Sequence, residues 1–161
     1  MQKYIRCHIV EAKSCTLGEW EQETGRTWNE PDRPRTEEGY KCDYPSGYSG
    51  WCPKGEFDKV SRPIDGMTFG MAIEAMKQGK KVARAGWNGK GMWLCVPLVE
   101  GPKEIPSTNI WGKPNADYAE QNGGTVKVMP YITMKAADGS IVMGWLASQT
   151  DMLSDDWQIV E

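Results

Sequence analysis

The chain has 161 residues and a formal net charge of −3. This length predicts one large domain or two small ones, because domains usually contain roughly 100–200 residues. The small acidic excess argues against a partner that is a nucleic acid polymer or an anionic membrane. No apolar run approaches the ~18 residues of a membrane-spanning helix, and the first residues do not resemble a signal peptide.

Five cysteines are present, an odd number, and none of them forms a Cys-x-x-Cys pair. This predicts reduced thiols in a cytoplasm rather than a secreted disulfide framework. A zinc site built from Cys7, Cys15, Cys42, Cys52 and His8 is an open alternative, but these spacings match no standard ligand pattern. We favour scattered small apolar side chains, and we expect neither a metal nor a cofactor.

The first module is expected to span residues 1–65, because Pro63 and Gly66 interrupt the chain just before a clear helix start. We interpret this module as a small α+β unit. In chain order it is expected to contain a strand over 3–12, a helix capped by Thr16 and ending at Glu23, a loop over 24–38, a hairpin over 39–44 and 48–52, and a short helix from Pro53.

The second module, residues 66–161, is expected to be an α+β domain in which an N-terminal helix packs on a mostly antiparallel sheet. Apolar residues follow Thr68 with helical spacing, and Gly79 ends the pattern. The later expected elements are strands over 80–85 and 92–98, a long loop over 100–125, strands over 126–136 and 140–146 joined by Asp138-Gly139, a helical turn from Ser148 to Leu153, and an edge strand over 157–160.

Two segments place tryptophan beside polar groups at expected turns. Trp87 is followed by Asn88, and Trp145 is followed closely by Ser148 and Asp151. A tryptophan in such a place suits stacking on a flat polar ligand such as a nucleobase. The alternative is that each indole only packs beneath a neighbouring strand.

The second module resembles the Thoeris anti-defence 2 family of small bacteriophage proteins over about residues 67–161. The resemblance rests on several motifs in combination. They are Thr68-Phe69-Gly70, Gly86-Trp87-Asn88-Gly89-Lys90-Gly91-Met92, Pro130-Tyr131-Ile132 and Trp145-Leu146-Ala147-Ser148-Gln149-Thr150-Asp151-Met152. Residues 1–65 resemble a module that recurs in phage proteins and has no known function.

The resemblance implies a non-enzymatic binder that inhibits Thoeris or a related anti-phage defence in the cytoplasm of the infected host. Proteins of this family bind the glycocyclic ADP-ribose signal made by TIR-domain immune enzymes and sequester it without cleavage. Some members also bind cyclic di- or trinucleotides. The family assembles as homotetramers with pockets between protomers, so we expect a small-molecule messenger and further copies of the chain as partners.

Trp87 and Trp145 match the tryptophans of the family motif, and we expect them to stack on a base. Asn88 is expected either to shape its turn or to hydrogen-bond a base edge or ribose. Arg84 is a candidate phosphate ligand, because a guanidinium can bind a phosphate at two points, and a surface charge at a strand end is the alternative.

The remaining candidates lie at helix starts or in apolar positions. Ser148 is expected to cap a helix whose N–H groups could receive a phosphate, with Gln149 beside it. Asp151 is expected to accept from amino or hydroxyl groups of the ligand, or else to complement the helix dipole. Phe69, Met92 and Met152 are expected either to line the ligand site or to fill the core.

Two other functions are compatible with the sequence. One is a nucleotide hydrolase or lyase, which the single histidine and the lack of a recognisable acid–base pair argue against. The other is a phage structural or adaptor protein whose tryptophans form oligomer interfaces. The adjacent acids Asp155 and Asp156 are interpreted as a solvated turn.

Overall fold

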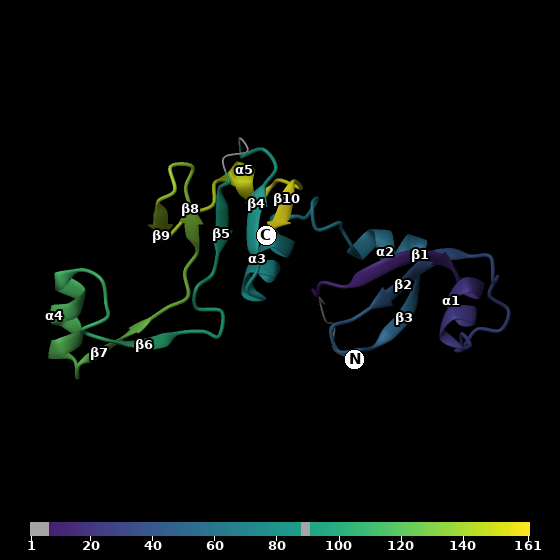
Figure 1. The fold of residues 1–161 in the computed structure, drawn as a ribbon, viewed down its shortest axis with the longest axis horizontal. Helices are drawn as coiled ribbons and strands as arrows, with labels where there is room; N and C mark the ends of the chain where they lie inside the picture. Colours follow the sequence, from purple (N-terminus) through teal and green to yellow (C-terminus); the bar gives the residue numbers. More distant parts are fainter. Residues whose placement is uncertain (1–6, 88–90) are drawn as a thin grey trace. The chain divides into compact units, whose positions relative to one another are not determined.

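The computed structural model describes residues 7–87 and 91–161 and divides into two compact units, Met1–Pro63 and Ile64–Glu161. Both units combine helices with antiparallel strands (Figure 1), which confirms the α+β class. Within the described ranges, no helix has the length and hydropathy needed to cross a membrane.

The first unit is a three-stranded antiparallel sheet with two short helices. Its strands, in the order β1-β2-β3, are Glu11–Thr16, Glu38–Asp43 and Ser49–Pro53. Helix α1 spans Leu17–Thr24 and α2 spans Lys54–Val60. Leu17, Trp20 and Trp51 form the buried core of this unit.

The start of α1 follows the sequence prediction closely. The Thr16 side chain accepts from the backbone N–H of Glu19, and the Glu19 carboxylate accepts from the backbone N–H of Thr16 at 2.7 Å. This reciprocal capping satisfies two N–H groups that the helix itself leaves without partners. Gly25 then ends the helix in the left-handed conformation, with φ of 66°.

The strand expected over residues 3–12 is wrong in its limits. The strand is Glu11–Thr16, residues 7–10 have no regular structure, and residues 1–6 lie outside the described ranges. The ladder with β2 begins where Glu11 faces Asp43 and ends where Thr16 faces Glu38. Pairing with β2 therefore sets the limits of β1, although the apolar residues lie earlier in the chain.

The second unit contains a five-stranded antiparallel sheet in the order β10-β4-β5-β8-β9. Helix α3, Phe69–Lys77, packs on β4 and β10, as Figure 1 shows. The strands are β4 Lys81–Arg84, β5 Trp93–Cys95, β8 Thr133–Lys135, β9 Ile141–Met143 and β10 Trp157–Val160, and a short helix α5 spans Gln149–Met152.

The core of the second unit lies between α3 and the sheet. Ala72, Met76, Val82, Leu94 and Trp157 are completely buried. The helix supplies its share because apolar residues recur on one face, as the sequence predicts. Its cap is the expected one, since the Thr68 side chain accepts from the backbone N–H of Met71 at 3.3 Å.

Residues 100–125 do not form the long loop expected from the sequence. They contain strand β6, Lys103–Pro106, and helix α4, Lys113–Gln121. Pro114 lies in the first turn of α4, where the missing N–H of proline costs nothing, so this proline does not mark a loop.

The strand expected over residues 126–136 is two strands. Strand β7, Thr125–Val128, pairs with β6 in a separate two-stranded sheet, and β8 pairs with β5 and β9. Pro130 lies between β7 and β8, and its lack of an N–H interrupts strand pairing. The hairpin at Asp138-Gly139 is confirmed, with Gly139 at φ of 92°.

Candidate functional site

Four aromatic rings of the second unit form one cluster. Trp157 is completely buried at its centre, and its indole N–H donates to the carbonyl of Asp151 at 2.9 Å. Trp87 and Trp145 lie at centroid distances of 5.4 Å and 6.4 Å from Trp157, and Phe69 lies 5.3 Å from it. The indoles of Trp87 and Trp145 are half-buried, so part of each ring remains accessible.

Trp87 and Trp145 also contact each other within one protomer. Their centroids are 6.1 Å apart and their planes are inclined by 66°, an edge-to-face arrangement. Edge-to-face rings do not form the two parallel walls of a base sandwich. Within one protomer this pair therefore presents the outer faces of its rings and does not form a sandwich.

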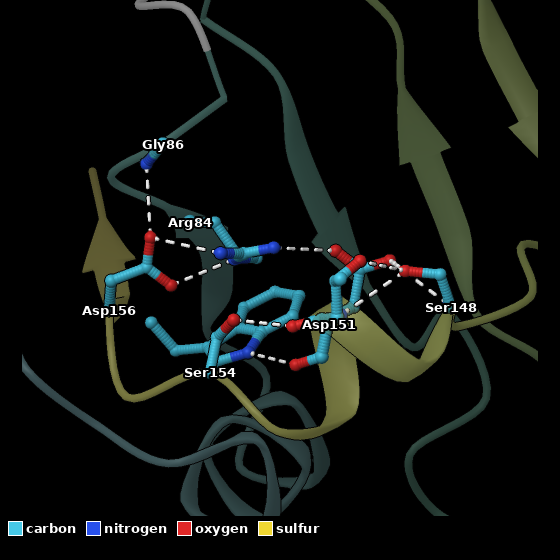
Figure 2. Close-up of polar contacts among 8 residues, drawn as sticks. Arg84, Gly86, Ser148, Asp151, Ser154 and Asp156 are labelled. Atoms are coloured by element: carbon cyan, nitrogen blue, oxygen red, sulfur yellow. Dashed lines mark hydrogen bonds and ion pairs between the residues drawn. The ribbon is translucent and has the colours of Figure 1, made fainter.

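Arg84 lies between two carboxylates, as Figure 2 shows. Its Nε and Nη2 donate to the two oxygens of Asp156 at 2.8 Å and 3.3 Å, and its Nη1 donates to Asp151 at 3.1 Å. The backbone N–H of Gly86 donates to the same Asp156 carboxylate at 3.1 Å. These contacts join the end of β4, the turn that carries Trp87 and the start of β10.

Asp151 has no oxygen free of contacts. Its Oδ1 accepts from Arg84, and its Oδ2 accepts from the hydroxyl and the backbone N–H of Ser148 at 2.6 Å and 3.0 Å. The Asp151 N–H in turn donates to the Ser148 hydroxyl at 3.2 Å, which completes a capping box on α5. The cap predicted for Ser148 is confirmed.

The charges of this network stabilise one another. The hydrogen bond to Asp156, followed by that to Asp151, raises the pKa of Arg84. Arg84 is likewise the main cause that lowers the pKa of Asp156. Burial alone would raise the pKa of Asp151, but hydrogen bonds from Ser148 and Arg84 outweigh it and the pKa is lowered. All three groups are therefore charged at neutral pH.

The structure brings most of the predicted site residues to one region, although in different roles. Arg84, Ser148 and Asp151 are engaged with one another, while Gln149 and Met152 are exposed on α5. Met92 is half-buried just before β5, and Asn88 lies outside the described residues.

The sequence patterns do not single out Asp156 and Trp157. The interpretation of Asp155-Asp156 as a solvated turn holds for Asp155, which is exposed, but is wrong for Asp156, which is half-buried and bound to Arg84. The feature that reveals Asp156 is the register of β10 on β4. In this register Trp157 faces Arg84, and Asp156 therefore lies beside the guanidinium. That register depends on tertiary pairing.

The cysteines give no indication of a metal centre. Those at 7, 15, 42, 52 and 95 are free thiols, and within residues 7–87 and 91–161 no group of three or more His, Cys, Asp or Glu side chains could hold a metal ion. Burial is the main cause that raises the pKa of Cys42 to about 11, so this thiol is protonated at neutral pH.

Comparison with known proteins identifies the second unit. A family model described as the Thoeris anti-defense 2-like domain matches residues 67–160. The chain belongs to this family. A relative named Thoeris anti-defense 2, from Bacillus phage SP01, is 39% identical over 95 residues, which are 58% of this chain and 94% of the relative.

The match to the Thoeris anti-defense 2-like domain confirms the family resemblance that the sequence motifs indicate. The matched region begins at Met67, which pairs with Trp157 in an isolated bridge, and it contains the aromatic cluster and the Arg84 network. Membership supports a function against the Thoeris defence of bacteria, as an anti-defence protein of a phage. The first unit lies outside the matched residues.

Proposed function

We propose that this protein sequesters a cyclic nucleotide immune signal of the glycocyclic ADP-ribose type and releases it unchanged. Holding the free signal below the level that activates the host effector would inhibit Thoeris defence by mass action. The family match supports the anti-Thoeris role. The observation that carries the binding mode is the pair of half-buried indoles, Trp87 and Trp145, in contact at 6.1 Å.

Stacking on this pair supplies a physical basis for tight binding. A base stacked on an aromatic side chain contributes about 1–3 kcal/mol. Gln149 is exposed at the start of α5, where its amide can donate to and accept from a base edge or ribose. Nanomolar affinity requires ~12 kcal/mol, so further contacts from a neighbouring protomer, including a second stacking wall, are needed to reach it.

The electrostatics of the site support binding without cleavage. Asp151 and Asp156 are paired with Arg84, and the pKa of each is lowered. A general acid or base works best when its pKa lies near the operating pH, so these ionised carboxylates are poorly matched to acid–base catalysis. His8 lies in the first unit, where its ring contacts Tyr44 at 5.7 Å.

We further propose that the protein acts as a homotetramer in the cytoplasm of the infected cell, with ligand pockets between protomers. Support comes from strand β9, which lies at the edge of its sheet and exposes three consecutive apolar side chains. Ile141, Val142 and Met143 are 54%, 45% and 48% exposed. Exposed apolar edge strands are suited to pairing with another chain.

A thermal-shift titration tests the proposal. Glycocyclic ADP-ribose at about 100 times its dissociation constant is expected to stabilise the native state by ~2.7 kcal/mol and to raise Tm. Linear ADP-ribose is the matched control, and cyclic di- and trinucleotides define the ligand range. If none of the cyclic nucleotides changes Tm, the result would favour a structural or adaptor role and overturn this proposal.

A further inference from the structure

The first unit contains a hollow that the family match does not cover. It has a volume of about 520 Å³ and lies where the segment after α1 meets the start of β3. Trp20, Arg26, Trp28, Tyr48 and Ser49 are among the residues that line it. The volume falls within the roughly 300–1,000 Å³ of typical small-molecule sites.

Aromatic rings form much of the wall. Trp20 and Trp28 meet edge to face, with centroids 6.0 Å apart and planes inclined by 83°. Tyr48 is 62% exposed, so its ring is available for contact with a ligand. The exposed ring of Tyr48 beside the half-buried Trp28 favours a ligand that is itself flat.

Three residues of this lining each carry a buried polar side-chain atom without a hydrogen-bond partner. The atoms are Nε1 of Trp20, Nε1 of Trp28 and Oγ of Ser49, and they are the three such side-chain atoms in the part of the chain that the structure describes. Buried donors without acceptors are rare and costly, and each calls for a physical explanation. All three atoms belong to residues that line one hollow, which points to an acceptor that binds there once the lining side chains adjust.

The charge of the lining indicates the kind of acceptor. No aspartate or glutamate lines the hollow, whereas Arg26 does. One N–H group of Arg26 donates to the Ser49 carbonyl at 2.6 Å, which fixes the guanidinium at the rim. Its other N–H groups are suited to a carboxylate or a phosphate.

We propose that the first unit binds a flat, ring-containing anion in this hollow. The ring stacks on the aromatic wall and the anionic oxygens contact Arg26. Ligand binding in this hollow requires that the half-buried Trp28 indole reorient from its contacts with Trp20 and Trp51 so that its N–H reaches the ligand. A nucleoside monophosphate and an aromatic carboxylate share this chemistry. The proposal concerns residues 20–50 and does not rest on messenger binding by the second unit.

The test uses the full chain labelled with 5-fluorotryptophan, whose fluorine signals are assigned by single Trp→Phe variants. AMP and indole-3-acetate are titrated separately, to ~10 mM, which would saturate a site with a dissociation constant near 1 mM. We expect at least one of them to shift the Trp20 and Trp28 signals saturably. Adenosine, which lacks the anion, and inorganic phosphate, which lacks the ring, are expected to bind at least about 10-fold more weakly.

The Arg26→Gln variant is expected to weaken binding of the active probe about 10-fold or more. Arg62→Gln is the matched control, because Arg62 is an exposed arginine of the same unit that donates to the carbonyls of Asp58 and Ser61. An unchanged Trp51 signal in both variants shows that the unit is folded.

Three outcomes would overturn the proposal. One is that neither probe shifts the two signals, which means that water satisfies the buried donors. Another is equal binding by Arg26→Gln and Arg62→Gln. The third is a response of the same signals to a peptide but to neither probe, which would assign the hollow to a protein partner.

Discussion

Arg84 and Asp156 are 72 positions apart in the chain, yet they form a two-point ion pair with N–O distances of 2.8 Å and 3.3 Å. The pair closes the turn that carries Trp87 against the loop that enters β10. Asp151 binds the same guanidinium from α5. The network therefore fixes the two segments that supply the indoles of the proposed ligand surface.

Removing Arg84 is expected to destabilise the second unit. The side chains of Arg84 and Asp151 are 19% and 14% exposed, so this ion pair is neither fully exposed nor fully buried. We expect Arg84→Gln to lower the free energy of unfolding by about 1–3 kcal/mol, because two carboxylates lose their common partner. Chemical denaturation measures the change.

Asp156→Asn is expected to show coupling to Arg84→Gln in a double-mutant cycle. Asp155→Asn is the matched control, because Asp155 is exposed and adjacent, and it is expected to change stability by less than ~0.5 kcal/mol. Strictly additive effects of Arg84→Gln and Asp156→Asn would show that the pair contributes nothing.

The same network predicts a dependence of stability on acid. The pKa values of Asp151 and Asp156 are lowered from an ordinary value of 3.8. Their contribution is therefore complete above the unfolded pKa and is lost as the pH falls below about 4 through the folded pKa values. Unfolding of wild type and Asp156→Asn between pH 7 and pH 2 checks this. The variant is expected to lose less stability over that range, and identical slopes would contradict the assignment.

Trp145→Ala is expected to weaken messenger binding roughly 5- to 150-fold, which corresponds to the 1–3 kcal/mol of one stacked base. Trp111→Ala is the matched control, because Trp111 is 76% exposed in the same unit and is not among the rings of the cluster. Calorimetric titration measures both. Equal affinities of the two variants would remove Trp145 from the ligand surface.

Ser148 and Gln149 are neighbours for which we expect different phenotypes. Ser148→Ala removes the cap of α5 and is expected to cost about 1 kcal/mol of stability. Gln149→Ala leaves the cap intact and is expected to weaken ligand binding with little effect on Tm. A melting curve and a binding isotherm for each variant separate the two roles, and a Gln149 variant with full affinity would exclude its amide from the site.

A positive charge introduced on strand β9 is expected to weaken the proposed assembly. Val142→Lys places an ammonium on the exposed edge strand and is expected to shift the protein to smaller species in light scattering after size exclusion. Met129→Lys is the matched control, because Met129 is 60% exposed but lies after β7, outside the five-stranded sheet. If Val142→Lys leaves the mass unchanged, β9 is not the interface.

Local chemistry explains which features could be predicted from the sequence. The caps at Thr16, Thr68 and Ser148 depend on residues within three positions, and all three are confirmed. The Asp138-Gly139 hairpin depends on a glycine at positive φ and is also confirmed. The limits of β1 and the ribbon of β6 and β7 depend on strand pairing, which apolar patterns alone do not determine.

The candidate site shows the same division. The structure places Phe69 and the motif tryptophans Trp87 and Trp145 in one cluster, and the ligand role of these residues stays a prediction. It also engages Arg84 and Asp151 with each other, whereas the sequence suggested separate ligand contacts for them. Composition and spacing do not reveal an ion pair between residues far apart in the chain. The sequence therefore could not decide whether Arg84 and Asp151 contact a ligand or contact each other.

Recovery of the bound messenger tests the central claim most directly. The protein is loaded with glycocyclic ADP-ribose, separated from free ligand, denatured by heat, and the released nucleotide is analysed by chromatography. A sequestering protein is predicted to return the cyclic compound intact and in proportion to the occupied sites. Recovery of a linear or hydrolysed product, or of no nucleotide at all, would contradict this account.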